Sequence, residues 1–90
     1  MKTVRCIVSG SVQGIGYRAW AKREARKLGV VGWIKNRDDG AVEAVVSGDD
    51  QDVDVFIKRA RQGPLLAHVV DITITSHRNK ETFSSFSVLQ

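Results

Sequence analysis

A glycine-rich segment near the start of the chain has the residue types of an anion-binding loop. Residues 10–18 read GSVQGIGYR, with glycines at positions 10, 14 and 16 and an arginine at the end. Successive backbone N–H groups of such a loop can point at one anion, and the first free N–H groups of a following helix add to them. Arginine suits an oxyanion because its planar fork donates to two oxygens at once. We therefore expect an oxyanion to bind in this loop, beside Arg18.

Other interpretations of the same loop have to be weighed. Residues 14–19 fit the dinucleotide pattern G-x-G-x-x-[GA], with Asp38 near the position of a ribose-binding acid. That fold needs further parallel βα units, and a chain of 90 residues with an early hairpin does not supply them. The Lys-[Ser/Thr] pair of a Walker nucleotide loop is absent. A tight strand-to-helix connection without a ligand stays open at this stage.

Apolar periodicity predicts the elements around the loop. Residues 2–9 alternate, with Val4, Cys6 and Val8 on one face, and predict a strand. Residues 17–28 predict a helix, and its apolar stripe comprises Tyr17, Trp20, Ala21, Ala25 and Leu28. We expect Gly29 to end that helix, since glycine readily takes the left-handed conformation found after helix C-termini.

The rest of the chain predicts further strands and a second helix. Strands are expected at 30–36 and 41–47, joined by a turn at 38–40, where glycine tolerates positive φ. Acidic residues after Gly48 favour a helix start, and its stripe comprises Val53, Phe56, Ile57 and Ala60. The rest predicts a strand at 66–76, a polar loop at 77–82 and a short last strand at 83–89.

This order of elements predicts an α+β fold, the ferredoxin-like split βαβ (βαββαβ). We expect residues 1–90 to form one domain, with an antiparallel sheet, two helices on one face and a short extra C-terminal strand. The other face should be more exposed. Its candidate residues are Arg5, Ile7, Trp33 and Phe86.

Composition limits the partners. The net charge is +4, from 14 basic and 10 acidic residues, and this field favours an anionic ligand. Cys6 is the only cysteine, which excludes an internal disulfide and a cysteine-rich metal site. No run reaches the roughly 18 apolar residues of a membrane span, and the first residues are too polar for a signal peptide. We expect a cytoplasmic monomer with no membrane partner.

The glycine-rich segment resembles the acylphosphatase pattern G-x-V-Q-G-V-x-[FY]-R, with Ile15 in place of valine. A second pattern of that family, from G-[WFY] through N-x-x-x-G to G-x-V, is similar to residues 32–42, although Ile34 is bulkier than usual. The resemblance covers nearly the whole chain. It implies a ferredoxin-like fold and hydrolysis of acyl phosphates to a carboxylate and inorganic phosphate.

The resemblance also implies roles for single residues. Arg18 would bind the phosphoryl group and Asn36 would position the attacking water, and both would be catalytic. The remaining phosphate-binding loop would comprise Ser11, Val12, Gln13, Gly14, Ile15, Gly16 and Tyr17. No metal or other cofactor is implied.

The residue types agree with an activated substrate. Neither His68 nor His77 is near the two motifs in sequence, and Cys6 lies within a strand without an activating neighbour. The candidate site therefore has an anion cradle, a guanidinium and an amide, but no general acid or base. An acyl phosphate expels a carboxylate, whose conjugate acid has a pKa of about 4–5, so it leaves without protonation. Holding the phosphoryl group and placing a water in line would suffice.

The main alternative is a non-catalytic anion- or RNA-binding module on the same fold. Ferredoxin-like sheets bind RNA when aromatic side chains on the open face stack on bases. The predicted third strand, residues 41–47, has no aromatic residue, so we expect no nucleic-acid partner. A module that handles a specialised substrate such as carbamoyl phosphate is the other alternative, and such modules lie in longer chains.

Overall fold

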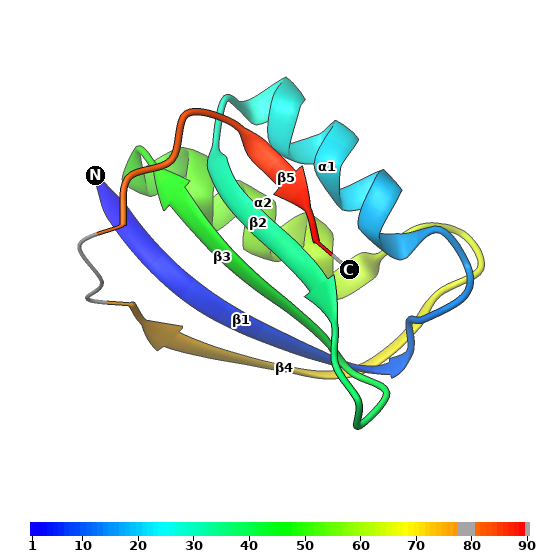
Figure 1. Ribbon diagram of the computed structural model, residues 1–90. Coiled ribbons are helices and arrows are strands. Elements are labelled where there is room, and N and C mark those ends of the chain that lie inside the picture. The colour runs from blue at the N-terminus through cyan, green and yellow to red at the C-terminus, as the bar shows by residue number, and fades with distance from the viewer. Residues whose placement is uncertain (78–80, 90) are drawn as a thin grey trace.

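The computed structural model describes residues 1–77 and 81–89, so residues 78–80 of the predicted polar loop and Gln90 lie outside the described part. The elements occur in the predicted order (Figure 1): β1 (Lys2–Ser11), α1 (Tyr17–Leu28), β2 (Val31–Asn36), β3 (Val42–Gly48), α2 (Asp50–Gln62), β4 (His68–Ser76) and β5 (Phe86–Val88). Neither helix is long and apolar enough to cross a membrane.

The sheet has the strand order β4-β1-β3-β2-β5. The pairs among β1 to β4 are antiparallel, as expected, whereas β5 lies parallel to β2 and makes the sheet mixed. The direction of β5 follows from the chain path. The strand β4 runs antiparallel to β2 across the sheet, so a strand that starts where β4 ends and returns along the edge of β2 must run the same way as β2 (Figure 1).

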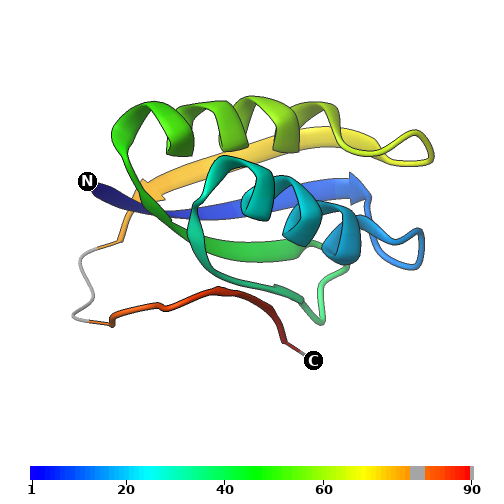
Figure 2. The ribbon, with the colours of Figure 1, turned by 90° about the horizontal axis from the view of Figure 1, so that it is seen from above.

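Both helices cover one face of the sheet (Figure 2), and the core lies between them and the strands. The predicted face of β1 is confirmed, because Val4, Cys6 and Val8 are all buried in this core. The two predicted helical stripes are confirmed as well. Their buried members are Tyr17, Ala21, Ala25, Val53, Phe56 and Ala60, and their partly buried members are Trp20, Leu28 and Ile57.

The open face carries three of its four predicted residues. Trp33 pairs with Val45 across the sheet, and Lys35 Nζ lies 5.4 Å from the centre of the Trp33 ring. The Arg5 guanidinium forms an ion pair with Glu43 on the same face, and Ile7, opposite Glu43 in the sheet, is half-buried.

The prediction for Phe86 was wrong. This residue lies beside Gly32, on the face that buries Ile34, and its ring packs against Phe56 with centroids 5.8 Å apart. Because β5 runs along β2 from its first residues, the alternation of β5 turns Phe86 toward the helices. The side chain therefore extends the core at its outer edge, below α1 and α2.

The predicted strand at 66–76 begins two residues later than expected, at His68. The reason is a turn, in which the Ala67 N–H donates to the Pro64 carbonyl at 2.9 Å. Leu65 lies at the tip of this turn and is 99% exposed. The apolar side chains before β4 extended the strand-like pattern in the sequence, while Pro64 set the turn in the structure.

The topology brings the end of β1, the end of β2 and the start of β3 to one end of the sheet. Val8 near the end of β1 pairs with Val42 at the start of β3, and Asn36 at the end of β2 pairs with the same Val42. The loop that follows β1 and the hairpin that joins β2 to β3 are therefore neighbours, as Figure 1 shows at the lower right. This end of the sheet holds the residues that the sequence motifs single out.

Candidate functional site

The glycine-rich loop has the backbone geometry of an anion cradle. Gly14 and Gly16 have φ of 77° and 80°, in the left-handed region, while Ile15 between them does not. A Cβ at either glycine would meet no atom within 4 Å, so the positive φ is the reason for glycine there. Alternating left- and right-handed residues turn successive N–H groups toward one side, where they can bind an anion.

The helix α1 begins directly at this loop. Its N-cap is Gly16, which has no side chain to occupy the first N–H groups, and the first turn has no acidic residue. The first intrahelical bond runs from the Trp20 N–H to the Gly16 carbonyl at 3.0 Å. The N–H groups of residues 17–19 therefore precede the helical ladder, at the positive end of the helix dipole. An anion at the loop would find these donors as well as those of the loop.

Arg18 lies in the first turn of α1 and is partly exposed. Its Nη1 donates to the Leu89 carbonyl at 2.9 Å, which links the guanidinium to the segment after β5. A single neutral carbonyl leaves most donors of the guanidinium fork for another acceptor. The contact orients Arg18 without neutralising its charge.

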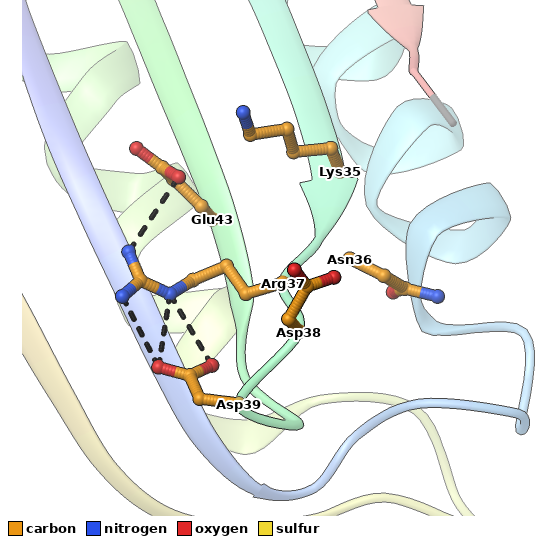
Figure 3. Close-up of a pocket in the computed structure, with 6 residues that line it drawn as sticks. All are labelled: Lys35, Asn36, Arg37, Asp38, Asp39 and Glu43. Carbon is orange, nitrogen blue, oxygen red and sulfur yellow. Dashed lines mark hydrogen bonds and ion pairs between the residues drawn. The ribbon is translucent and has the colours of Figure 1, made fainter.

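Asn36 is the last residue of β2, one position before the hairpin turns. Its Oδ1 is buried and accepts no hydrogen bond from any described residue. A buried acceptor without a donor costs about 1–3 kcal/mol, so such atoms usually mark strain or a ligand. In Figure 3 the side chain points toward the start of α1. Asn36 thus places its amide on the side of the glycine-rich loop, and its Oδ1 has unused hydrogen-bonding capacity.

One pocket brings these features together. It has a volume of about 190 Å³ and is lined by Val12, Gly14, Gly16, Tyr17, Arg18, Ala19, Asn36 and Val88. The two residues with predicted catalytic roles, which are 18 positions apart in the sequence, therefore share one cavity with the cradle. We take this pocket as the candidate site.

A wider pocket of about 370 Å³ lies on the other side of Asn36 (Figure 3). Its charges are largely paired with one another, because the Arg37 guanidinium contacts Asp39 at 3.1 Å and Glu43 at 3.6 Å. The hydrogen bond from Arg37 holds the pKa of Asp39 below its ordinary value, and the Ala41 N–H adds to this. Arg37 and its two carboxylate partners therefore brace the hairpin. The pocket lining has three carboxylates against two cations, Lys35 and Arg37, so it does not favour an anion.

Three of the predicted loop residues, Ser11, Gln13 and Ile15, do not line the pocket, and a fourth, Tyr17, lines it with a side chain that is nearly inaccessible. Ser11 is the last residue of β1 and pairs with His68. Ile15 packs against the core. The Gln13 amide reaches the hairpin after Asn36, and Tyr17 lines the pocket but is only 2% exposed.

Tyr17 is a structural residue by its contacts. Its hydroxyl donates to the Ala60 carbonyl in α2 at 2.7 Å, and burial raises its pKa well above the ordinary value. We expect Tyr17→Phe to lower the free energy of unfolding by about 1 kcal/mol, because the Ala60 carbonyl loses its donor. Turnover should change less than about twofold. Urea unfolding beside steady-state kinetics tests this, and a large fall in kcat in a stable variant would contradict it.

The cysteine and the two histidines lie outside the pocket. Burial raises the pKa of the Cys6 thiol to about 12, so the reactive thiolate is scarcely populated near neutral pH. His68 and His77 lie on or beside β4, and neither lines the pocket. Within residues 1–77 and 81–89 no three side chains among His, Cys, Asp and Glu come together as metal ligands would.

The structure adds site residues that the sequence did not indicate. Ala19 and Val88 line the pocket, and the Leu89 carbonyl holds Arg18. Ala19 follows Arg18 directly, so the motif could have included it. Val88 and Leu89 carried no such signal, because their position depends on β5 pairing with β2.

Comparison with known proteins places the chain in a family. The family model described as acylphosphatase matches residues 4–88. A curated protein of Methylococcus capsulatus, named acylphosphatase, is 42% identical over 90 residues, which cover all of this chain and 98% of that protein.

Solved structures give the same result for the fold. The crystal structure of acylphosphatase from Bacillus subtilis superposes with a TM-score of 0.95 at 38% identity, covering 100% of both chains. The structure of an acylphosphatase from Coxiella burnetii superposes with a TM-score of 0.92 at 30% identity, covering 98% of this chain and 92% of the other. Both matches include the loop, α1 and the hairpin, since nearly the whole chain is covered.

Proposed function

Because the chain belongs to the acylphosphatase family, we propose that the pocket between residues 11–18 and Asn36 is its active site. The reaction cleaves the carboxyl-phosphate bond of an acyl phosphate with water and gives a carboxylate and inorganic phosphate. The fold is that of acylphosphatases over the whole chain.

The cradle and Arg18 hold the phosphoryl group. The N–H groups of the loop and of the first turn of α1 donate to its oxygens, and the helix dipole favours its negative charge. Arg18 lies in the same turn and can donate two parallel hydrogen bonds to the group. In phosphoryl transfer, charge spreads over the equatorial oxygens, so fixed donors around them lower the barrier.

Asn36 orients the attacking water. The observation that carries this assignment is its buried Oδ1, which lacks a donor among the described residues although it belongs to a pocket-lining side chain. A turn of the side chain into the pocket would bring Oδ1 to a water there. The water O–H would then satisfy Oδ1, and its oxygen lone pair could face the phosphorus. The amide fixes the direction of the water and takes no proton from it.

The pocket needs no general acid for the leaving group. As water attacks, the P–O bond to the carboxyl oxygen breaks, and the electron pair leaves with the carboxylate. One proton of the water stays on its oxygen and the other passes to a phosphoryl oxygen, which gives dihydrogen phosphate. The conjugate acid of that group has a pKa of about 4–5, so it departs as an anion at neutral pH. An alkyl phosphate ester would expel an alkoxide instead and should be a poor substrate. This explains why the pocket works with a guanidinium, an amide and backbone donors.

Hydrolysis of benzoyl phosphate by the purified protein, with EDTA present, tests the reaction. We expect rapid loss of the substrate and stoichiometric release of benzoate and phosphate. An alkyl ester such as glycerol phosphate should be hydrolysed far more slowly. A folded protein that leaves benzoyl phosphate at the spontaneous rate would contradict the proposed function.

Inorganic phosphate should inhibit competitively, since the product fits the same cradle as the substrate's phosphoryl group. Sulfate should do the same, because it offers oxygens of similar geometry. We expect both anions to raise the apparent KM for benzoyl phosphate and to leave kcat unchanged. A series of rates at several phosphate concentrations checks this, and a pure effect on kcat would place the anion outside the pocket.

A cytoplasmic location and a monomeric state stay predictions, and size-exclusion chromatography with light scattering tests the second. The small-molecule acyl phosphate and the phosphate product are the partners that the family membership gives.

A further inference from the structure

We propose that Gln13 is a positioning residue, whose side chain fixes the Asn36 hairpin at a set distance from the phosphate cradle. This inference rests on the proposed function. The sequence placed Gln13 in the phosphate-binding loop, but its side chain does something else. Its Nε2 donates to the Arg37 carbonyl at 2.8 Å and to the Ala41 carbonyl at 2.9 Å. Both acceptors belong to the hairpin that begins directly after Asn36.

The two bonds use the full donor capacity of the amide, since a glutamine Nε2 has two N–H groups. The acceptors already close the hairpin itself. The Arg37 N–H donates to the Ala41 carbonyl at 2.8 Å, and the Gly40 N–H donates to the Arg37 carbonyl at 3.3 Å. Each of these carbonyls therefore takes a second bond from Gln13. The amide thus connects the loop to the two residues that form the neck of the hairpin.

The surroundings of the contact favour a role in positioning. Gln13 is half-buried, and the hairpin is braced on its other side by the Arg37 guanidinium with Asp39 and Glu43. Asn36 directly precedes Arg37, whose carbonyl Gln13 holds, and its Oδ1 accepts no hydrogen bond from a described residue. Its place relative to the cradle therefore depends on the backbone that Gln13 holds.

The distance between Asn36 and the phosphate cradle matters for the reaction. Attack in line on phosphorus requires the water on Asn36 to lie opposite the leaving oxygen, and a displacement of about 1 Å can cost a hundredfold in rate. The cradle lies in the connection from β1 to α1 and Asn36 lies at the end of β2, so the two are far apart in the sequence and no short stretch of chain sets their separation. The bonds from Gln13 provide that link across 24 and 28 positions of the sequence.

Gln13→Glu is the sharpest variant, because glutamate has nearly the same shape but no donors, and its carboxylate would face two carbonyl oxygens. Gln13→Leu removes the donors without adding charge and guards against misfolding of the first variant. We expect either change to lower kcat by about tenfold or more. The inhibition constant of inorganic phosphate should change less than about threefold, because the backbone donors of the cradle remain.

A double-mutant cycle with Asn36→Ala separates this role from a general structural one. If Gln13 acts through Asn36, Gln13→Leu should lower kcat less than about twofold when Asn36 is already alanine. Multiplicative losses in the double variant would overturn the proposal. So would a wild-type kcat in the single Gln13 variants, or a rise in the phosphate inhibition constant that matches the fall in kcat.

The double-mutant cycle also distinguishes a wrong role for Gln13 from a wrong proposed function. If Asn36→Ala alone retains full kcat, the role of Asn36 in catalysis is wrong, and the positioning role of Gln13 falls with it. If Asn36→Ala loses kcat but the losses multiply, the function stands and only the role of Gln13 is refuted. Thermal melting of every variant confirms that the folded protein is compared throughout.

Discussion

Arg18→Ala is expected to lower kcat/KM for benzoyl phosphate by about a thousandfold or more. Arginines that stabilise the charge of a transferring phosphoryl group contribute effects of this size. Arg18 lies in the pocket, in the first turn of α1, and its hydrogen bond within the described residues goes to the neutral Leu89 carbonyl. Removing the side chain should therefore cost the transition state its main positive charge while the fold is preserved.

Arg18→Lys gives the sharper test of geometry. Lysine keeps the charge but lacks the planar fork, so it can attract the phosphoryl group without donating two parallel bonds. We expect a loss of about a hundredfold, between those of wild type and alanine. Arg23→Ala is a matched control, because Arg23 lies on the exposed side of the same helix. A lysine variant with full activity would show that charge alone is used, and equal losses in the Arg23 variant would indicate an unspecific effect.

Much of the fold follows from patterns that are local in the sequence. The alternation of Val4, Cys6 and Val8 and the stripe of α1 each report which face is buried, and both were correct. The order of elements then gives the four antiparallel strands, since the split βαβ leaves few arrangements. The direction of β5 and the burial of Phe86 were not predicted correctly, because they depend on how the chain crosses the end of the sheet after β4.

In the candidate site, too, local features could be predicted from the sequence and long-range contacts could not. Backbone conformation can be predicted from residue type, so the glycines at 14 and 16 and the adjacent Arg18 marked a cradle in the sequence. Asn36 could be associated with that cradle only through the second motif. The contacts of Gln13 and Arg18 left no signal, because their acceptors are main-chain carbonyls, which every residue has. A contact between a side chain and a main-chain carbonyl depends on the fold, and the residue type of the partner does not reveal it.

Asn36→Ala is the second change with a large expected effect. We expect kcat to fall by about a hundredfold to a thousandfold, as it does when one oriented polar group is removed from a transition state. The inhibition constant of inorganic phosphate should change less than about threefold, because the cradle and Arg18 remain. Steady-state kinetics with benzoyl phosphate, in parallel with phosphate inhibition, gives both quantities. Equal losses in turnover and in phosphate binding would show that Asn36 holds the phosphoryl group instead of the water.

The effect of Asn36→Ala on stability should differ from the effect expected if Asn36 had a structural role. The Oδ1 of Asn36 is buried without a donor among the described residues, so alanine removes an unsatisfied acceptor. The free energy of unfolding should therefore stay the same or rise by up to about 1 kcal/mol. Asp38→Ala is the control, since Asp38 is exposed in the same hairpin and should change neither stability nor kcat appreciably. A destabilised Asn36→Ala protein would mean that the fold uses this amide. A stable protein with little turnover would mean that the amide is kept for the reaction, at the expense of the fold.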